Sequence, residues 1–122
     1  MDETVSAPEC RLVTGLLSRI GDKWTVQIVM ELRQRTMRFN EVKRAVGGIS
    51  QQMLTRTLKA LERVGLVRRT VHPTVPPQVE YALTPLGHSL SGPVMELGSW
   101  ARANLPAIER SRADYDRGTM HG

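Results

Sequence analysis

The chain has 122 residues, a length that suits one domain with a single hydrophobic core. No stretch approaches the roughly 18 consecutive apolar residues of a membrane span, and residues 1–9 lack the basic and apolar regions of a signal peptide. Aromatic residues make up only 4% of the chain, which argues against a surface that stacks on unpaired bases. We therefore expect a cytoplasmic protein with no membrane partner.

Catalysis and metal binding find little support in the sequence. Cys10 is the sole cysteine, so no disulfide can form within the chain, and the three histidines are isolated from one another. Cys10 has no nearby histidine to act as its base, and Gly47-Gly48 is not followed by the lysine of a phosphate-binding loop. We expect no catalytic residues, no metal and no cofactor, and therefore no enzyme.

Positive charge is concentrated in the middle of the chain. Residues 33–69 contain ten Lys or Arg residues and two Glu residues, a net charge of +8, so the rest of the chain carries −3 of the total of +5. A basic middle with slightly acidic ends is the pattern expected of a surface that binds phosphate groups, and the few aromatics favour duplex DNA. The alternative is an ordinary solvated surface, since charges close in sequence need not share one face.

Three helices are expected before residue 50. Apolar residues at helical spacing indicate a first helix that ends at Gly21, and Asp22 is placed to cap a second. A short third helix is predicted over residues 39–46, because the two glycines that follow it can adopt the positive φ of a sharp turn. The expected buried stripe of the second helix is Trp24, Ile28, Val29 and Leu32.

Residues 50–65 predict a fourth helix with two distinct faces. Ser50 is a favourable N-cap, and leucines recur on one side at Leu54, Leu58 and Leu61. Gln can pair bidentately with adenine, Arg with guanine, and the Thr methyl can meet a thymine methyl. A generic solvated helix face is the alternative. The opposite side carries the candidate base-facing residues Gln51, Gln52, Thr55, Arg56 and Lys59.

A hairpin is expected after the fourth helix. Residues 66–71 and 79–83 have the β-branched or alternating pattern of strands, and a proline-rich turn separates them. Arg68 and Arg69 on the first strand can reach phosphate or an adjacent minor groove, although a charged edge that prevents aggregation is the alternative. The predicted fold class is therefore mainly α, a winged helix-turn-helix with a two-stranded β wing.

Apolar residues continue at helical spacing after the hairpin, from Leu86 to Ile108. The stripe is longer than the core of such a small domain needs, which indicates dimerisation, and packing back on its own domain is the alternative. Pro93 and Pro106 are expected to break this helical region into pieces. The expected organisation is a flexible N-terminus over 1–9, one domain over 10–110 and a disordered tail over 111–122.

These motifs, taken in order, resemble the HxlR-type transcriptional regulators, a winged-helix family related to the MarR group. The resemblance covers about Cys10 to Ala101. It implies a homodimeric, sequence-specific DNA-binding regulator with the third and fourth helices as its helix-turn-helix, and a two-fold dimer implies a pseudo-palindromic operator. The motifs that carry it are Ile20-Gly21-Asp22-Lys23-Trp24, Arg38-Phe39-Asn40-Glu41-Val42, Ile49-Ser50 with the leucine series to Gly65-Leu66-Val67, and Pro76 to Thr84 with Gly87.

The resemblance also assigns expected roles. Residues 50–59 would enter the major groove, Arg38 would contact backbone phosphate, and helices from both chain ends would form the dimer interface. The bound protein would then be associated with the nucleoid. The candidate phosphate and wing residues are Arg38, Lys43, Ser50, Arg68 and Arg69. The candidate dimer residues are Leu12, Leu16, Leu90, Val94, Leu97, Trp100 and Ala101.

Cys10 matches a family position that in some relatives senses oxidants or electrophiles through an intersubunit disulfide or an adduct. A helix N-terminus beside Arg11 favours a reactive thiol, whereas a small buried apolar residue is the commoner role of a free cysteine. Two departures from the family pattern are Asp22 in place of a second glycine, and Arg11 in place of a proline after the cysteine. A ligand-responsive or constitutive regulator, with or without a small-molecule effector, and a winged-helix protein-interaction module stay open as alternatives.

Overall fold

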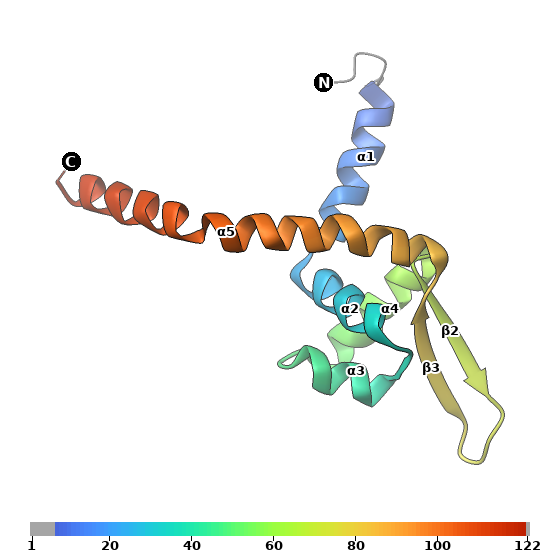
Figure 1. Cartoon of the computed structure of the whole chain (residues 1–122). Coiled ribbons are helices and arrows are strands. Elements are labelled where there is room, and N and C mark those ends of the chain that lie inside the picture. The colour runs from blue at the N-terminus through green and yellow to red at the C-terminus, as the bar shows by residue number, and fades with distance from the viewer. Residues whose placement is uncertain (1–6, 122) are drawn as a thin grey trace. The chain divides into compact units, whose positions relative to one another are not determined.

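The computed structural model describes residues 7–121, and its elements follow the order expected of a winged helix-turn-helix (Figure 1). The predicted flexible N-terminus lies outside the described residues up to residue 6, and residues 7–9 already belong to the first helix. The elements are α1 (Ala7–Ile20), α2 (Lys23–Gln34), β1 (Met37–Arg38), α3 (Phe39–Val46), α4 (Gln51–Arg63), β2 (Val67–His72), β3 (Gln78–Leu83) and α5 (Pro85–His121).

Side-chain caps begin α2 and α4 at the predicted residues. The Asp22 carboxylate accepts hydrogen bonds from the backbone N–H groups of Trp24 at 2.8 Å and Thr25 at 3.3 Å. The Ser50 hydroxyl accepts from the N–H of Met53 at 3.0 Å. Each cap satisfies first-turn N–H groups that have no partner inside the helix. Both predicted N-caps are therefore confirmed.

The sheet has three antiparallel strands in the order β1-β3-β2, whereas the sequence predicts two. β2 and β3 pair from Val67 opposite Leu83 to His72 opposite Gln78, and β1 pairs with the other edge of β3 through Met37 opposite Tyr81. β1 is only two residues long, too short to show the alternation that identifies a strand in a sequence. The predicted hairpin is confirmed, and the third strand is an addition to it.

The core lies where α2, α3 and α4 pack together and against the sheet. All three predicted leucines of α4 are buried, as are Val42 and Val46 of α3. Fully burying each such side chain contributes about 1.5–3 kcal/mol. In the predicted stripe of α2, Ile28, Val29 and Leu32 are buried while Trp24 is half-buried. The buried side of α4 is therefore fixed, and its polar side faces solvent.

Thr84 and Gly87 tie the end of α4 and the start of β2 to the first turn of α5. The Thr84 hydroxyl donates to the carbonyl of Gly65 at 2.5 Å and accepts from the N–H of Gly87 at 3.0 Å. A Cβ on Gly87 would lie 2.2 Å from the carbonyl oxygen of Leu66, so this close approach admits only glycine. The junction holds the hairpin in register beside α4.

α5 is one helix over Pro85–His121, whereas the sequence predicts breaks at the prolines and a disordered tail over 111–122. Each proline removes one backbone donor, and the carbonyls that lose this partner belong to Ser89 and Arg102, which are both exposed residues. Opposite charges at helical spacing support the last turns, including an ion pair between Arg117 and Asp114. These local interactions are invisible to a prediction based on apolar content alone.

The chain divides into two compact units with the boundary between Ser91 and Gly92, whereas the sequence predicts one domain over 10–110. From Gly92 onward no described side chain is buried. The first unit contains the buried core described above, and the second is a helical segment without a core of its own. Within the described residues, no helix is both long enough and apolar enough to cross a membrane.

Candidate nucleic-acid interface

The polar face of α4 gathers the predicted base-facing residues around one surface depression of about 810 Å³. Thr55 is half-buried, and the other four base-facing side chains are exposed. The N-terminal part of α4, from Gln51 to Lys59, therefore presents amides, a hydroxyl and two cations side by side. The depression is lined by Ser50, Gln51, Gln52, Thr55, Arg56 and Lys59.

The functional groups on this face are free to bind a partner. Within the described part of the chain, Gln51, Gln52, Arg56 and Lys59 make no side-chain hydrogen bond or ion pair to the protein. Thr57, by contrast, is buried, and its hydroxyl donates to the carbonyl of Met53 at 2.8 Å. The two threonines of α4 thus differ, and Thr55 is the one available for recognition.

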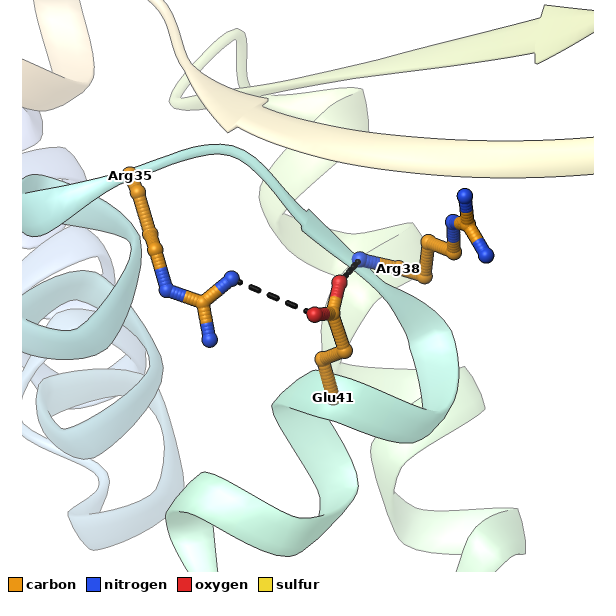
Figure 2. Close-up of polar contacts among 3 residues, drawn as sticks. All are labelled: Arg35, Arg38 and Glu41. Atoms are coloured by element: carbon orange, nitrogen blue, oxygen red, sulfur yellow. Dashed lines mark hydrogen bonds and ion pairs between the residues drawn. The ribbon is translucent and has the colours of Figure 1, made fainter.

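Arg35, Arg38 and Glu41 show how one arginine is held by the protein while another is left free (Figure 2). One carboxylate oxygen of Glu41 accepts from the backbone N–H of Arg38 at 2.8 Å, and the other pairs with the Arg35 guanidinium at 3.2 Å. The Arg38 N–H and then the Arg35 guanidinium hold the pKa of Glu41 below its ordinary value. The Arg38 guanidinium points away from this pair and has no partner among the described residues.

The other predicted phosphate residues around the helix-turn-helix differ in their availability. Lys43 is half-buried on α3, and Ser50 is exposed. The Ser50 oxygen already accepts the capping hydrogen bond from Met53, so only its hydroxyl proton is left to donate to a phosphate. Of the two cations, Arg38 is therefore the more exposed to solvent.

Arg68 and Arg69 are both exposed but lie on opposite faces of the sheet. Arg69 is opposite Tyr81, on the face toward α4, whereas Arg68 is opposite Ala82. Arg69 lines a cavity of about 190 Å³ together with Thr55, Lys59 and other residues of α4. The sequence prediction treats the two arginines alike, although strand alternation alone would have separated them.

Two arrangements of residues near the sheet were not predicted from the sequence. The His72 imidazole and the Glu80 carboxylate pair at 2.5 Å across the hairpin. A second depression of about 500 Å³ brings residues of α3 together with the start of β3. Both depend on strand register across the proline turn, which no local pattern reveals. The residues lining this depression are Arg38, Phe39, Asn40, Glu41, Arg44, Pro77, Gln78 and Val79.

The candidate dimer residues are mostly exposed. Leu12 is 76% exposed, Leu97 68% and Trp100 58%, while Leu16 and Ala101 are also exposed and Val94 is half-buried. Leu90 is different, because it is half-buried against the core of the first unit. Its packing matches the alternative that the sequence left open for the start of the stripe.

Cys10 is a half-buried residue of α1, three residues after the helix begins. In the described residues, no group of three or more His, Cys, Asp and Glu side chains is placed to hold a metal ion.

Comparison with protein families gives a match to the HxlR-like helix-turn-helix family over residues 19–109, which is most of the chain. The chain belongs to this family. The matched range contains α2 to α4, the sheet and part of α5, so α3 and α4 are the helix-turn-helix of an HxlR-like protein and the β2-β3 hairpin is its wing. The relatives are transcriptional regulators rather than enzymes.

Individual relatives of this HxlR-like protein agree in sequence and in fold. An uncharacterised helix-turn-helix regulator of Escherichia coli K12, YtfH, is 43% identical over 93 residues, which cover 76% of this chain and 74% of YtfH. A solved structure of the putative regulator ytfH from Salmonella typhimurium is 40% identical with a TM-score of 0.75, covering 83% and 90% of the two chains. The reduced form of the redox regulator HypR is 37% identical with a TM-score of 0.75, covering 81% and 98%.

Proposed function

We propose that this HxlR-like regulator binds a pseudo-palindromic operator as a homodimer, with α4 of each protomer in a major groove. The observation that carries the proposal is the cluster of free polar side chains on the N-terminal part of α4, opposite its buried leucines. A recognition helix contacts base edges with its N-terminal residues. The polar face of α4 has the position and the residue types for that contact.

Base readout on this face follows from hydrogen-bonding geometry. The amides of Gln51 and Gln52 match the N6 and N7 groups of adenine, and the guanidinium of Arg56 matches O6 and N7 of guanine. Thr55 can place its methyl group against a thymine methyl, and Lys59 can reach guanine or a phosphate. Each good bidentate contact contributes about 1–3 kcal/mol of discrimination between bases.

Exposed apolar side chains support the homodimer. α1 exposes Leu12, Val13, Leu16 and Leu17, and the second unit exposes Leu97, Trp100 and Leu105. Large apolar side chains exposed on a small protein favour association. A two-fold dimer would place its recognition helices about 34 Å apart, in successive major grooves, which is why the operator should be a pseudo-palindrome.

Operator selection from a random duplex library, followed by fluorescence anisotropy, tests the proposal. At about 150 mM salt we expect binding to the selected duplex at least about 1,000-fold tighter than to a shuffled duplex. The affinity should fall steeply as salt rises, because bound phosphates release counterions. Equal affinity for both duplexes would overturn the proposal, and salt-insensitive capture of a protein would instead favour a protein-interaction module.

Redox control through Cys10 is a second candidate, favoured by the similarity to the redox regulator HypR. Because the chain has one cysteine, Cys10 cannot form a disulfide within the chain. It could respond to an oxidant by an intersubunit disulfide, or to an electrophile by forming an adduct. Diamide would oxidise the Cys10 thiols of two protomers to a disulfide, accepting their two hydrogens. We expect diamide to change operator binding of the wild type and to leave Cys10→Ser unchanged. An equal response in both would leave a ligand-responsive or constitutive regulator.

A further inference from the structure

A second depression lies outside the α4 face and is lined by residues of α3 and the start of β3. It has a volume of about 500 Å³, and its lining includes two guanidinium groups, of Arg38 and Arg44, and two amides, of Asn40 and Gln78. Asn40 and Arg44 are four residues apart on α3, so they share one helix face, and Gln78 approaches from β3. We call these four residues the α3–β3 cluster.

The charges around the cluster favour an anion. In the part of the chain that the structure describes, the guanidiniums of Arg38 and Arg44 have no hydrogen-bond or ion-pair partner. The two nearby carboxylates are both engaged, since Glu41 binds the Arg38 N–H and Arg35, and Glu80 pairs with His72. Two cations without a partner among the described residues therefore line the depression, whereas the carboxylate that also lines it, Glu41, is already bound to the Arg38 N–H and to Arg35.

We propose that the α3–β3 cluster is a seat for one backbone phosphate of the operator, with Arg38 and Arg44 supplying the charge and Asn40 and Gln78 supplying neutral donors. The inference rests on the proposed function and adds Asn40, Arg44 and Gln78 to the DNA contacts. Arginine suits a phosphate because its planar fork can donate two parallel hydrogen bonds to two oxygens.

The place of the cluster in the fold explains why phosphate is its partner. In a helix-turn-helix the helix before the recognition helix crosses the DNA backbone, and here that helix is α3. The base-reading side chains of α4 line a separate depression, so the cluster is not part of the base-reading face. Phosphate contacts set the position and register of the protein on the duplex without reading sequence.

Salt titration of alanine variants tests this seat. We expect Arg44→Ala to weaken binding to selected and shuffled duplexes alike, roughly fivefold to tenfold for each bound protomer at about 100 mM salt. Its log-log salt slope should become shallower by about 0.9 for each protomer. Asn40→Ala and Gln78→Ala should weaken binding less and leave the slope unchanged, because neither side chain carries charge.

Arg112→Ala is the matched control, because it removes the same charge from an exposed residue of α5. Circular dichroism of each variant checks that the fold is retained. If Arg44→Ala weakens DNA binding no more than Arg112→Ala does, the proposed phosphate site at the α3–β3 cluster is wrong. This result is distinct from failure of the proposed function, which would appear as a wild-type protein without sequence preference. The seat itself can still be measured on a non-specific duplex.

A neutral methylphosphonate placed at single backbone positions of the duplex identifies the contacted phosphate. One substituted position in each half-site should remove the difference between wild type and Arg44→Ala, and the same position should remove the effect of Arg38→Ala. If the effect of Arg44→Ala persists at every substituted position, Arg44 does not bind a phosphate and the inference is wrong. If free inorganic phosphate weakens binding of wild type and Arg44→Ala equally, any anion site lies elsewhere.

Discussion

The α4 face and the terminal helices both expose side chains that a monomer leaves without partners, but the side chains are opposite in character. On α4 they are amides and cations beside a surface depression, and the buried leucines lie on the other side of the same helix. On α1 and on the second unit they are leucines and a tryptophan, and none of the described side chains from Gly92 onward is buried.

The difference indicates two different partners. Unpaired amides and cations suit a hydrated, charged partner such as duplex DNA. Large exposed apolar side chains favour removal from water, at about 25 cal/mol for each Å² buried, and suit a second copy of the chain. Substitutions on the apolar surface should therefore act through assembly, and substitutions on the polar surface should act on DNA affinity alone.

Trp100→Glu should have the largest effect. A charge within the exposed apolar surface of the second unit would oppose the proposed dimer, so we expect monomers in analytical ultracentrifugation and operator affinity lower by about 100-fold or more. Ser99→Glu adds the same charge at the neighbouring exposed residue and should have a much smaller effect. A Trp100→Glu protein that stays dimeric would show that this surface does not form the interface.

Arg69→Ala should have an intermediate effect that distinguishes the two sheet faces. We expect roughly fivefold to tenfold weaker binding to all duplexes for each bound protomer, because a phosphate contact carries no sequence information. Arg69 shares a cavity with Lys59, so a double-mutant cycle of these two residues should show coupling. The cycle of Arg68 with Lys59 should be additive within about 0.5 kcal/mol, because Arg68 lies on the opposite face. Equal coupling in both cycles would contradict the strand register.

The smallest expected effect is on the pKa of the Glu41 carboxyl, which NMR titration can measure. This carboxyl should titrate below the ordinary value of 4.5, so the stability it contributes is present at higher pH and is lost as the pH falls through the folded pKa. Arg35→Ala should raise this pKa only partway, because the N–H of Arg38 is the larger cause of the lowering. A titration midpoint at or above 4.5 in the wild type would contradict the hydrogen bonds shown in Figure 2.

Much of the first unit follows from local patterns. The Asp22 and Ser50 caps, the helix over Phe39–Val46 and the buried leucines of α4 are each encoded within a few residues, and the structure agrees with all of them. The same local pattern defines the polar face of α4, since fixing the leucines fixes the opposite side of the helix. These features needed no knowledge of the tertiary fold.

Other features depend on contacts or surroundings that a local pattern does not contain. The sequence-based predictions either lacked these features or differed from the structure. β1 exists only because Met37 pairs with Tyr81, and the α3–β3 cluster needs Gln78 beside α3. α5 continues through Pro93 and Pro106, where the residues that lose a helical partner are exposed, and an ion pair supports its last turns. A rule based on residue propensity predicts a helix break at a proline, or disorder in a polar stretch, without information on solvent exposure or charge pairing.

Base recognition by α4 is tested most directly by measuring wild type and Arg56→Ala against a panel of operators that each carry one substituted base pair. Wild-type binding should lose about 1–3 kcal/mol at each contacted position. Arg56→Ala should lose discrimination at one position in each half-site and keep it at the others. If Arg56→Ala weakens binding by the same factor at every position and keeps the full discrimination pattern, α4 does not read bases through Arg56 and the central claim is contradicted.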